Sequence, residues 1–156
     1  MGIQADIEVR EQPDTIVYNI RTADSNMLIG QHGVNLSALQ YICRVLAKRK
    51  FTDITDIDFV IDVDDYKKKR ELYLVSLAEK AYKEAVGNNK GVVLRPMSSY
   101  ERRLVHSTLS SFGDVATDSI GEEPRRMVTI RPKNYSVDID PNSLDFGMGD
   151  DYIVLE

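Results

Sequence analysis

The sequence predicts an α+β protein made of two small modules, and three observations support this prediction. Apolar residues alternate with polar ones in several short runs, which is typical of half-buried strands. In other runs the apolar residues recur at helical spacing, with capping residues before them and glycines after them. The chain has 156 residues, which is enough for one ordinary domain or two small ones.

The first half of the chain is expected to fold as strand–strand–helix–helix–strand. Alternation over residues 7–9 and 16–20 predicts two strands joined by a turn at Pro13-Asp14. A short helix begins at Asp24 or Ser25 and ends at Gly30, and a second helix runs from after Gly33 to about residue 48. Residues 57–63 alternate again and predict a third strand. The second helix is expected to turn these apolar residues inward: Leu36, Leu39, Ile42, Cys43 and Leu46.

The second half is expected to fold as helix–strand–helix–strand–strand, with a three-stranded sheet. Asp64-Asp65 can cap a long helix, and Gly87 ends it. Ser98 and Glu101 have the spacing of a capping box at the start of the second helix. The expected elements are a helix over residues 66–86, a strand over 92–94, a helix over 99–112, and hairpin strands over 115–119 and 127–131.

Composition excludes several classes of protein. Hydrophobic residues make up 42% and charged residues 29% of the chain, which fits a soluble globular protein. No run approaches the roughly 20 apolar residues of a membrane-spanning helix, and the N-terminus has no secretory signal pattern. The single cysteine, Cys43, cannot form an internal disulfide, and with only His32 and His106 it cannot complete a zinc site. We therefore expect no cofactor, no membrane insertion and a cytoplasmic location.

The charge is unevenly distributed along the chain. The net charge is −5, yet residues 1–133 carry 20 basic and 19 acidic residues, and 14 of the basic ones lie between residues 44 and 103. The acidity follows Lys133, after which the charged residues are all acidic: Asp138, Asp140, Asp145, Asp150, Asp151 and Glu156. The overall charge thus does not exclude a nucleic-acid partner, and an acidic tail near the basic face would weaken polyanion binding. Alternatively, residues 135–139 form an edge strand.

Gly30-Gln31-His32-Gly33 lies between the two predicted helices of the first half. Two glycines three residues apart allow a sharp turn and a close approach of another backbone. The N–H groups that open the next helix then suit a phosphate group, helped by the helix dipole. Ser37 and Arg44 lie on the polar side of that helix. The alternative is an ordinary turn between helices.

The second motif is Arg102-x-x-x-His106, whose two residues are one helical turn apart and share a face. We expect this face, with Arg103, to be exposed and to bind phosphates and bases, with Arg125 and Arg126 of the hairpin adding contacts. The alternative is structural: Arg102 pairs with an acid such as Glu122, and His106 covers the core.

Both motifs resemble known nucleic-acid-binding modules. The first, with Ile29-Gly-Gln-His-Gly and the following Leu36-x-Ala-Leu-Gln-Tyr, is similar to bacterial KH domains, whose G-x-x-G loop holds about four nucleotides. The second, with Arg95-Pro before it and Gly121-Glu-Glu-Pro after it, resembles the R-three-H module, which binds single-stranded nucleic acids. A KH module followed by an R-three-H module resembles the bacterial Jag (SpoIIIJ-associated) family.

This resemblance implies two domains, a KH-like domain over residues 1–64 and an R-three-H domain over 65–133, and an acidic C-terminal extension over 134–156 follows them. It also implies single-stranded RNA as a partner and a second, smaller KH protein as another, while homo-oligomer formation stays open. Three features depart from the family pattern, and one of them is the acidic extension after Lys133. Gln31 and His32 replace the Lys or Arg often found in the loop, and the family's N-terminal domain is not visible, so we expect a short member or a fragment.

The function predicted from the sequence is non-catalytic binding of single-stranded RNA, as a post-transcriptional regulator or an RNA chaperone. Motifs of nucleotide-binding enzymes, metalloproteases and serine hydrolases are not found, so we expect no enzyme activity. Two alternatives stay open. One is binding of single-stranded DNA, and the other is a protein-interaction adaptor that docks through the acidic tail and its apolar end, residues 152–155.

Overall fold

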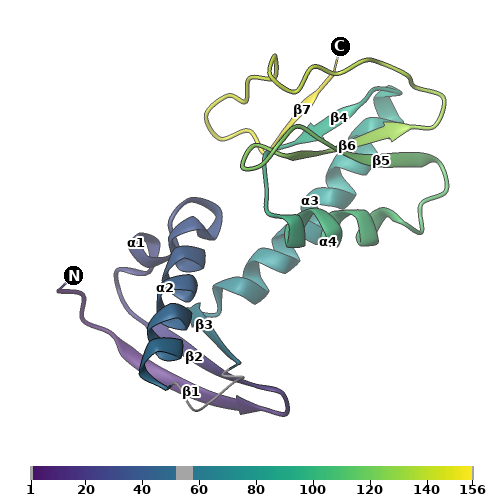
Figure 1. Ribbon diagram of the computed structural model, residues 1–156. Helices are drawn as coiled ribbons and strands as arrows, with labels where there is room; N and C mark the ends of the chain where they lie inside the picture. Colours follow the sequence, from purple (N-terminus) through teal and green to yellow (C-terminus); the bar gives the residue numbers. More distant parts are fainter. Residues whose placement is uncertain (1, 52–57, 156) are drawn as a thin grey trace. The chain divides into compact units, whose positions relative to one another are not determined.

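A computed structural model describes residues 2–51 and 58–155, and it confirms the α+β class. The chain divides into two compact units, Met1–Lys69 and Arg70–Glu156 (Figure 1). Helix α3 (Tyr66–Asn88) begins in the first unit and continues into the second. Each unit contains one β-sheet and its own hydrophobic core.

The first unit has the predicted order of elements, strand–strand–helix–helix–strand. Strand β1 is antiparallel to β2, and β2 is parallel to β3, so β2 is the central strand. Ile57, which the alternation assigned to the third strand, lies outside the described residues. The elements are β1 (Asp6–Gln12), β2 (Thr15–Arg21), α1 (Ser25–Ile29), the 3₁₀ turn η1 (Gln31–Gly33), α2 (Val34–Lys50) and β3 (Phe59–Val63).

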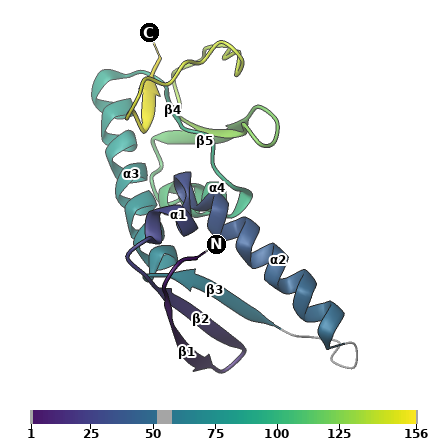
Figure 2. The same cartoon turned by 90° about the vertical axis from the view of Figure 1, so that its left-hand side faces the viewer.

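Helices α1 and α2 lie on one face of this sheet (Figure 2). Gln40 fixes α2 beside β3, since its amide donates to the Phe59 carbonyl at 3.1 Å and accepts from the Ile61 N–H at 2.7 Å. The flank of α2 turned away from β3 is left uncovered. The expectation that Ile42 and Leu46 face the core is therefore wrong, because they are 52% and 57% exposed.

The start of α3 differs from the expected cap. The carboxylate of Asp62, rather than Asp64 or Asp65, accepts the Lys67 N–H of the first helical turn at 3.2 Å. Asp65 instead accepts from two guanidinium groups, those of Arg10 at 2.6 Å and Arg21 at 2.8 Å. These hydrogen bonds lower the pKa of Asp65 to about 2. Ion pairs with Arg10 of β1 and Arg21 of β2 therefore hold Asp65, the residue before α3, against the sheet.

The second unit contains a four-stranded sheet, not the three-stranded one expected. The elements after α3 are β4 (Val92–Leu94), α4 (Ser99–Leu109), β5 (Val115–Ile120), β6 (Met127–Pro132) and β7 (Tyr152–Val154). The sheet order is β5-β6-β4-β7, and all pairs are antiparallel. The additional strand comes from the acidic C-terminal segment. The capping box of Ser98 and Glu101 is confirmed at the start of α4.

The core of the second unit lies between the sheet and helices α3 and α4. The segment between β6 and β7 runs along the side of the sheet opposite α4 (Figures 1 and 2). Its residues 135–139 form no strand, contrary to the alternative considered for the tail. The apolar end, residues 152–155, is paired within the chain through β7 and the backbone of Leu155, which weakens the adaptor alternative.

Candidate nucleic-acid interface

The turn between α1 and α2 requires glycine at both of its ends. Gly30 has φ 68° and Gly33 has φ 83°. Residues with a Cβ rarely adopt such positive φ angles. A Cβ at Gly30 would lie 2.6 Å from Cγ of Asn35, and one at Gly33 would lie 2.9 Å from a ring carbon of Tyr66. The two glycines therefore provide both the backbone conformation and the space for packing around the turn.

The start of α2 presents its backbone toward the exposed residues Gln31 and His32. Gly33 is the N-cap and has no side chain with which to cap the helix, and no acidic residue lies in the first turn of α2. His32 itself has a left-handed backbone, with φ 54°. The Asn35 amide donates to the Met27 carbonyl at 2.8 Å and ties α1 to α2. A helix start with glycine as its N-cap, and with its positive dipole end beside exposed polar side chains, can bind an anion such as a phosphate.

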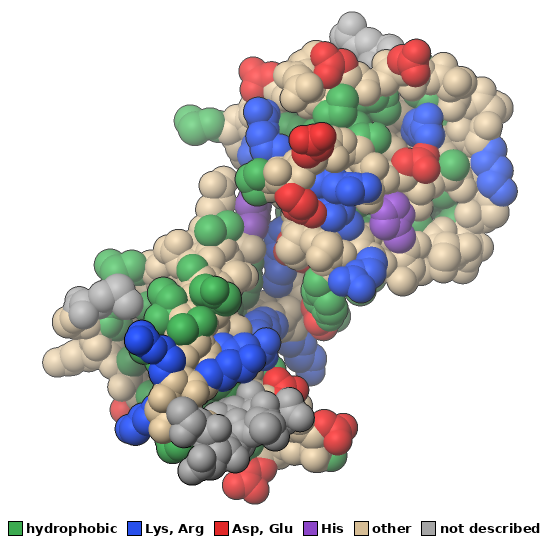
Figure 3. Space-filling model, viewed as in Figure 1, with side chains coloured by type: hydrophobic (Ala, Val, Ile, Leu, Met, Phe, Trp, Pro, Cys, Tyr) green, Lys and Arg blue, Asp and Glu red, His purple; other side chains and the backbone are tan. Residues whose placement is uncertain are grey.

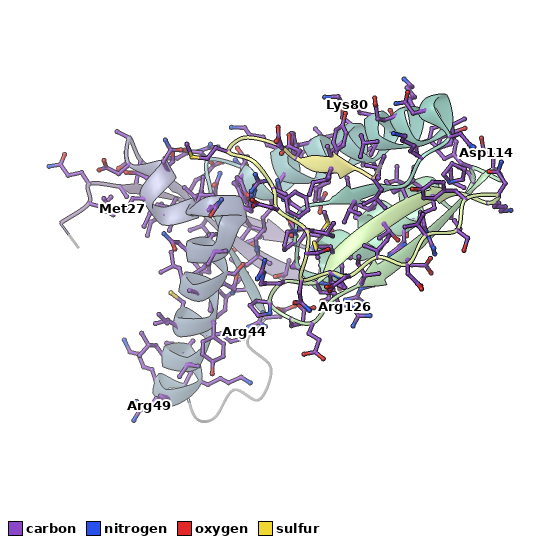
Figure 4. The ribbon with its side chains drawn as sticks, turned by 90° about the horizontal axis from the view of Figure 1, so that it is seen from above. Met27, Arg44, Arg49, Lys80, Asp114 and Arg126 are labelled. Carbon is purple, nitrogen blue, oxygen red and sulfur yellow. The ribbon has the colours of Figure 1, made fainter. Side chains whose placement is uncertain are left out.

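Helix α2 adds positive charge to this unit. Ser37 and Arg44 are exposed, as expected, and Arg44 lies 3.4 Å from Asp58 in an exposed ion pair. The helix contains no acidic residue, and its last turn carries Lys48, Arg49 and Lys50. Figure 3 shows basic side chains beside hydrophobic ones over this helix, and Figure 4 labels Arg44 and Arg49 along it. Burial lowers the pKa of Lys67, and the charge of Arg44 acts in the same direction, so the two cations lie near each other.

Arg102 does not lie on an exposed face. Its residue surface is only 7% exposed, so the expectation that Arg102 lies on an exposed face is wrong. Its guanidinium donates to the Met97 carbonyl at 2.7 Å and to a carboxylate oxygen of Glu123 at 2.6 Å. The Arg-x-x-x-His face of α4 thus turns toward the β5–β6 hairpin. The acidic partner is Glu123, whereas the structural alternative had suggested Glu122.

His106 packs against β5 and is half-buried. One ring nitrogen lies 2.8 Å from the Thr117 hydroxyl, and the other lies 3.0 Å from the Ser119 hydroxyl. A neutral imidazole can donate to one hydroxyl and accept from the other. Burial lowers the pKa of His106 below 6.5, the charge of Asp118 opposes this shift, and that of Arg102 adds to it.

This lowered pKa predicts that acid destabilises the second unit. The unfolded chain protonates His106 near pH 6.5, while the folded unit keeps it neutral to lower pH. Below pH 6.5 the unfolded state therefore binds more protons, and the free energy of unfolding falls as the pH drops toward the folded pKa. We expect the melting temperature of the parent to fall more between pH 7.5 and 5.5 than that of His106→Gln. An NMR titration of the ring protons with a midpoint at or above 6.5 would contradict this.

Three of the predicted arginines of the second unit are exposed: Arg103, Arg125 and Arg126. Arg125 and Arg126 lie on the β5–β6 loop, where Figure 4 shows Arg126. The loop is held in place, because the Arg125 N–H donates to the Glu122 carbonyl at 2.8 Å and the Arg126 carbonyl accepts from Met97 at 3.2 Å. Met97 also bonds to Arg102, so α4 and this loop are positioned together.

Arg95 is a further cation of the second unit, and sequence reasoning did not include it among the site residues. Its guanidinium is held by residues 146–150 of the tail. The signal in the sequence is weak, because the contacting residues are separated from Arg95 by about fifty positions.

Two further findings concern only the described residues 2–51 and 58–155. No three His, Cys, Asp or Glu side chains within them are grouped so that they could hold a metal ion. No helix among them is both long enough and apolar enough to span a membrane.

Comparison with known proteins finds one matching domain family and several similar proteins. Residues 73–132 match the family model of the R-three-H domain. Three proteins named "RNA-binding protein KhpB" are similar over most of the chain. That of Lactiplantibacillus plantarum is 35% identical over 130 residues, covering 83% of this chain and 40% of its own.

The relative from Clostridium symbiosum is 31% identical over 133 residues, covering 85% of this chain and 59% of its own. The one from Bacillus subtilis is 30% identical over 135 residues, covering 83% of this chain and 62% of its own. The chain thus spans between two fifths and just over three fifths of the length of these three relatives.

Proposed function

Because the chain is a homologue of the KhpB proteins of the Jag family and contains an R-three-H domain, we propose that it binds single-stranded RNA without catalysis. The observation that carries the proposal is the turn from Gly30 to Gly33. Two glycines with positive φ flank the turn, the second of them is the N-cap of α2, and the first turn of that helix contains no acidic residue. This is the geometry that a G-x-x-G loop needs to hold a nucleic-acid backbone.

In the first unit, a phosphate binds at the start of α2, between Gln31 and His32. Arg44 lies about three turns further along the same helix, where it contacts a phosphate further along the strand, and the exposed Ser37 hydroxyl is an additional donor. Neither loop side chain is a full cation at neutral pH on reference values. Backbone N–H groups and the helix dipole therefore supply most of the binding at the loop itself.

In the second unit, the exposed Arg103, Arg125 and Arg126 contact phosphates. Arg102 acts as a positioning residue, since its bonds to Met97 and Glu123 fix the loop that carries two of these arginines. His106 contributes as a neutral, half-buried ring whose two nitrogens bond to hydroxyl groups of β5, and the exposed part of the ring contacts a base of the RNA. This replaces the expectation that Arg102 itself holds a phosphate.

The cellular role that fits these contacts is a post-transcriptional regulator or an RNA chaperone in the cytoplasm. The proposed protein groups contact phosphates, apart from the His106 ring, which contacts a base. Few of these groups could distinguish one base from another. A protein of this kind binds many RNAs and needs no catalytic group.

Single-stranded DNA is the alternative ligand, because the proposed contacts include none that is specific for a 2′-hydroxyl. Competition by unlabelled RNA and DNA oligomers of matched sequence, read by fluorescence polarisation of a labelled RNA, separates the two. We expect RNA to compete more strongly, because the relatives of this chain are named as RNA-binding proteins. Equal or stronger competition by DNA would reassign the ligand.

A second, smaller KH protein is the protein partner that we propose. Helix α2 exposes an apolar set of side chains, each at least 38% exposed: Val34, Tyr41, Ile42, Val45 and Leu46. The same helix has four cations and no acid, so pairing with a second copy would bring like charges together. A partner with acidic residues beside an apolar face fits better. Light scattering of this chain alone and mixed with such a KH protein tests this, and a homo-oligomer formed by the chain alone would assign the face to a second copy.

A further inference from the structure

The C-terminal segment folds back onto the edge of the second sheet. Strand β7 pairs with β4, and the Leu155 N–H donates to the Gly91 carbonyl at 2.8 Å. A Cβ at Gly91 would lie 2.8 Å from Cδ1 of Leu155 and 3.0 Å from a ring carbon of Tyr135, so the tail approaches this backbone closely. Lys80 of α3 lies 5.4 Å from the centre of the Tyr152 ring.

Arg95, directly after β4, is enclosed by the same segment. Its guanidinium donates to the carbonyl oxygens of Asp150 and Gly147 and lies 5.4 Å from the centre of the Phe146 ring. Its backbone N–H donates to the Asp151 carbonyl at 3.1 Å. Burial, together with a hydrogen bond to Asp151, raises the pKa of Tyr73 to about 12, which places this carboxylate beside α3.

These contacts are of the kind that a single-stranded nucleic acid offers to an arginine. An aromatic ring lies near the guanidinium, where a base can stack, and oxygen atoms accept from its N–H groups, as phosphate oxygens do. The oxygens are neutral carbonyls, and none of the ion pairs among residues 2–51 and 58–155 includes Arg95. A phosphate would supply the opposite charge that the carbonyls lack.

The tail also passes the loop proposed to bind RNA. A Cβ at Gly121 would lie 3.4 Å from Cβ of Pro141, and Gly121 stands at the start of the loop that carries Arg125 and Arg126. In Figure 4 the chain between β6 and β7 runs beside the labelled Arg126. Asp140 directly precedes Pro141, so the tail carries an acidic residue next to the position that approaches this loop.

We propose that Arg95 is a further RNA-binding residue, and that residues 146–155 occupy its site in the free protein. When single-stranded RNA binds, a phosphate and a stacked base replace the Gly147 and Asp150 carbonyls and the Phe146 ring. Tail and RNA are then mutually exclusive, and the tail sets the affinity of the second unit. This inference rests on the proposed function, because it takes single-stranded RNA as the ligand.

The tail is suited to such an exchange because its strand is short and lies at the edge of the sheet. Strand β7 has three residues at the edge of the sheet, each only half-buried, and a long connection without regular structure precedes it. Short edge strands of this kind open at low free-energy cost. Because linkage is reciprocal, a ligand that binds only when the tail is released must itself favour release of the tail.

Hydrogen exchange on the unmodified chain directly tests whether RNA binding displaces the tail. Saturating single-stranded oligouridine should speed amide exchange at residues 151–155 by about tenfold, while amides of β6 keep their protection. Unchanged or slower exchange at 151–155 in the RNA-bound protein would overturn the proposal, because it would show that tail and RNA are bound together.

Variants of the full chain test Arg95. Ile153→Pro removes the N–H in the middle of β7 and should raise affinity for oligouridine about tenfold. Adding Arg95→Gln should abolish this gain, whereas Lys133→Gln, which removes the same charge from another exposed position, should leave it intact. Loss of the gain with both variants, or with neither, would contradict a specific role for Arg95.

These tests separate the two proposals. If the parent does not bind oligouridine at all, the proposed function fails. If the parent binds, but the tail amides and the Arg95 variant show no coupling, only the present inference fails. If Ile153→Pro does not fold, the exchange experiment on the unmodified chain still decides.

Discussion

Replacing Gln31 and His32 together with aspartate is expected to lower the affinity for single-stranded RNA about a hundredfold. The two carboxylates would lie where the proposed phosphate contacts the start of α2. Each charge-assisted contact there is worth about 1.5–3 kcal/mol, so the loss of one or two of them gives an effect of this size. Fluorescence polarisation with a labelled oligouridine measures it.

The fold should survive this change. Both side chains are exposed, and aspartate is among the residues that most readily adopt the left-handed backbone found at His32. The matched control replaces the same two residues with asparagine, which has the shape of aspartate but no charge. We expect the asparagine variant to bind within about threefold of the parent. If the aspartate variant bound oligouridine as tightly as the asparagine variant, no phosphate would bind at this turn.

Most of the fold was predictable because local signals agree with each other. The glycines at 30 and 33, the capping box at Ser98 and the alternation in the first two strands all mark elements that the structure confirms. The inward face of α2 was predicted less well. Ile42 and Leu46 have the right period to be buried, but α2 packs along β3 and leaves that flank uncovered. Periodicity shows which residues share a helix face. It does not show how much of that face the neighbouring sheet covers.

The fourth strand of the second sheet was missed for a related reason. Strand β7 is three residues long and comes after an acidic, glycine-containing stretch, so it has no alternation to detect. Its partner β4 lies almost sixty residues earlier, and only the fold brings the two together. The same distance in sequence conceals the enclosure of Arg95 by the tail.

The candidate site was predicted in part. The residues of the G-x-x-G turn and the exposed arginines lie where expected, but Arg102 does not. A charged residue on a helix is usually exposed, so sequence reasoning assigned Arg102 to the solvent side. Its burial depends on the Met97 carbonyl and on Glu123, which the hairpin loop brings beside α4. A loop twenty-one residues away cannot be placed from helical periodicity.

The second large effect arises from this burial: Arg102→Ala should destabilise the second unit by about 3 kcal/mol. The variant loses two hydrogen bonds, one of them to a carboxylate, and leaves the Met97 carbonyl without its partner. Truncating a buried side chain adds a packing loss. For a unit of this size, the melting temperature should fall by roughly 10–20 °C in a calorimetric scan.

Arg103→Ala is the matched control, because Arg103 is the next residue on the same helix and is exposed. Its stability should stay within about 0.5 kcal/mol of the parent, since exposed substitutions rarely do more. Its RNA binding should weaken, and the slope of log affinity against log salt should fall by about 0.7, the value for one phosphate contact with a single strand.

Arg102→Ala, measured at a temperature where it is folded, should keep the parent's salt slope, because a buried guanidinium paired with Glu123 releases no counterion from RNA. The two arginines therefore separate into a positioning residue, whose loss is seen in stability, and a binding residue, whose loss is seen in salt dependence. The opposite pattern, with a stable Arg102→Ala variant whose salt slope falls by about 0.7, would show that Arg102 leaves Glu123 to hold a phosphate.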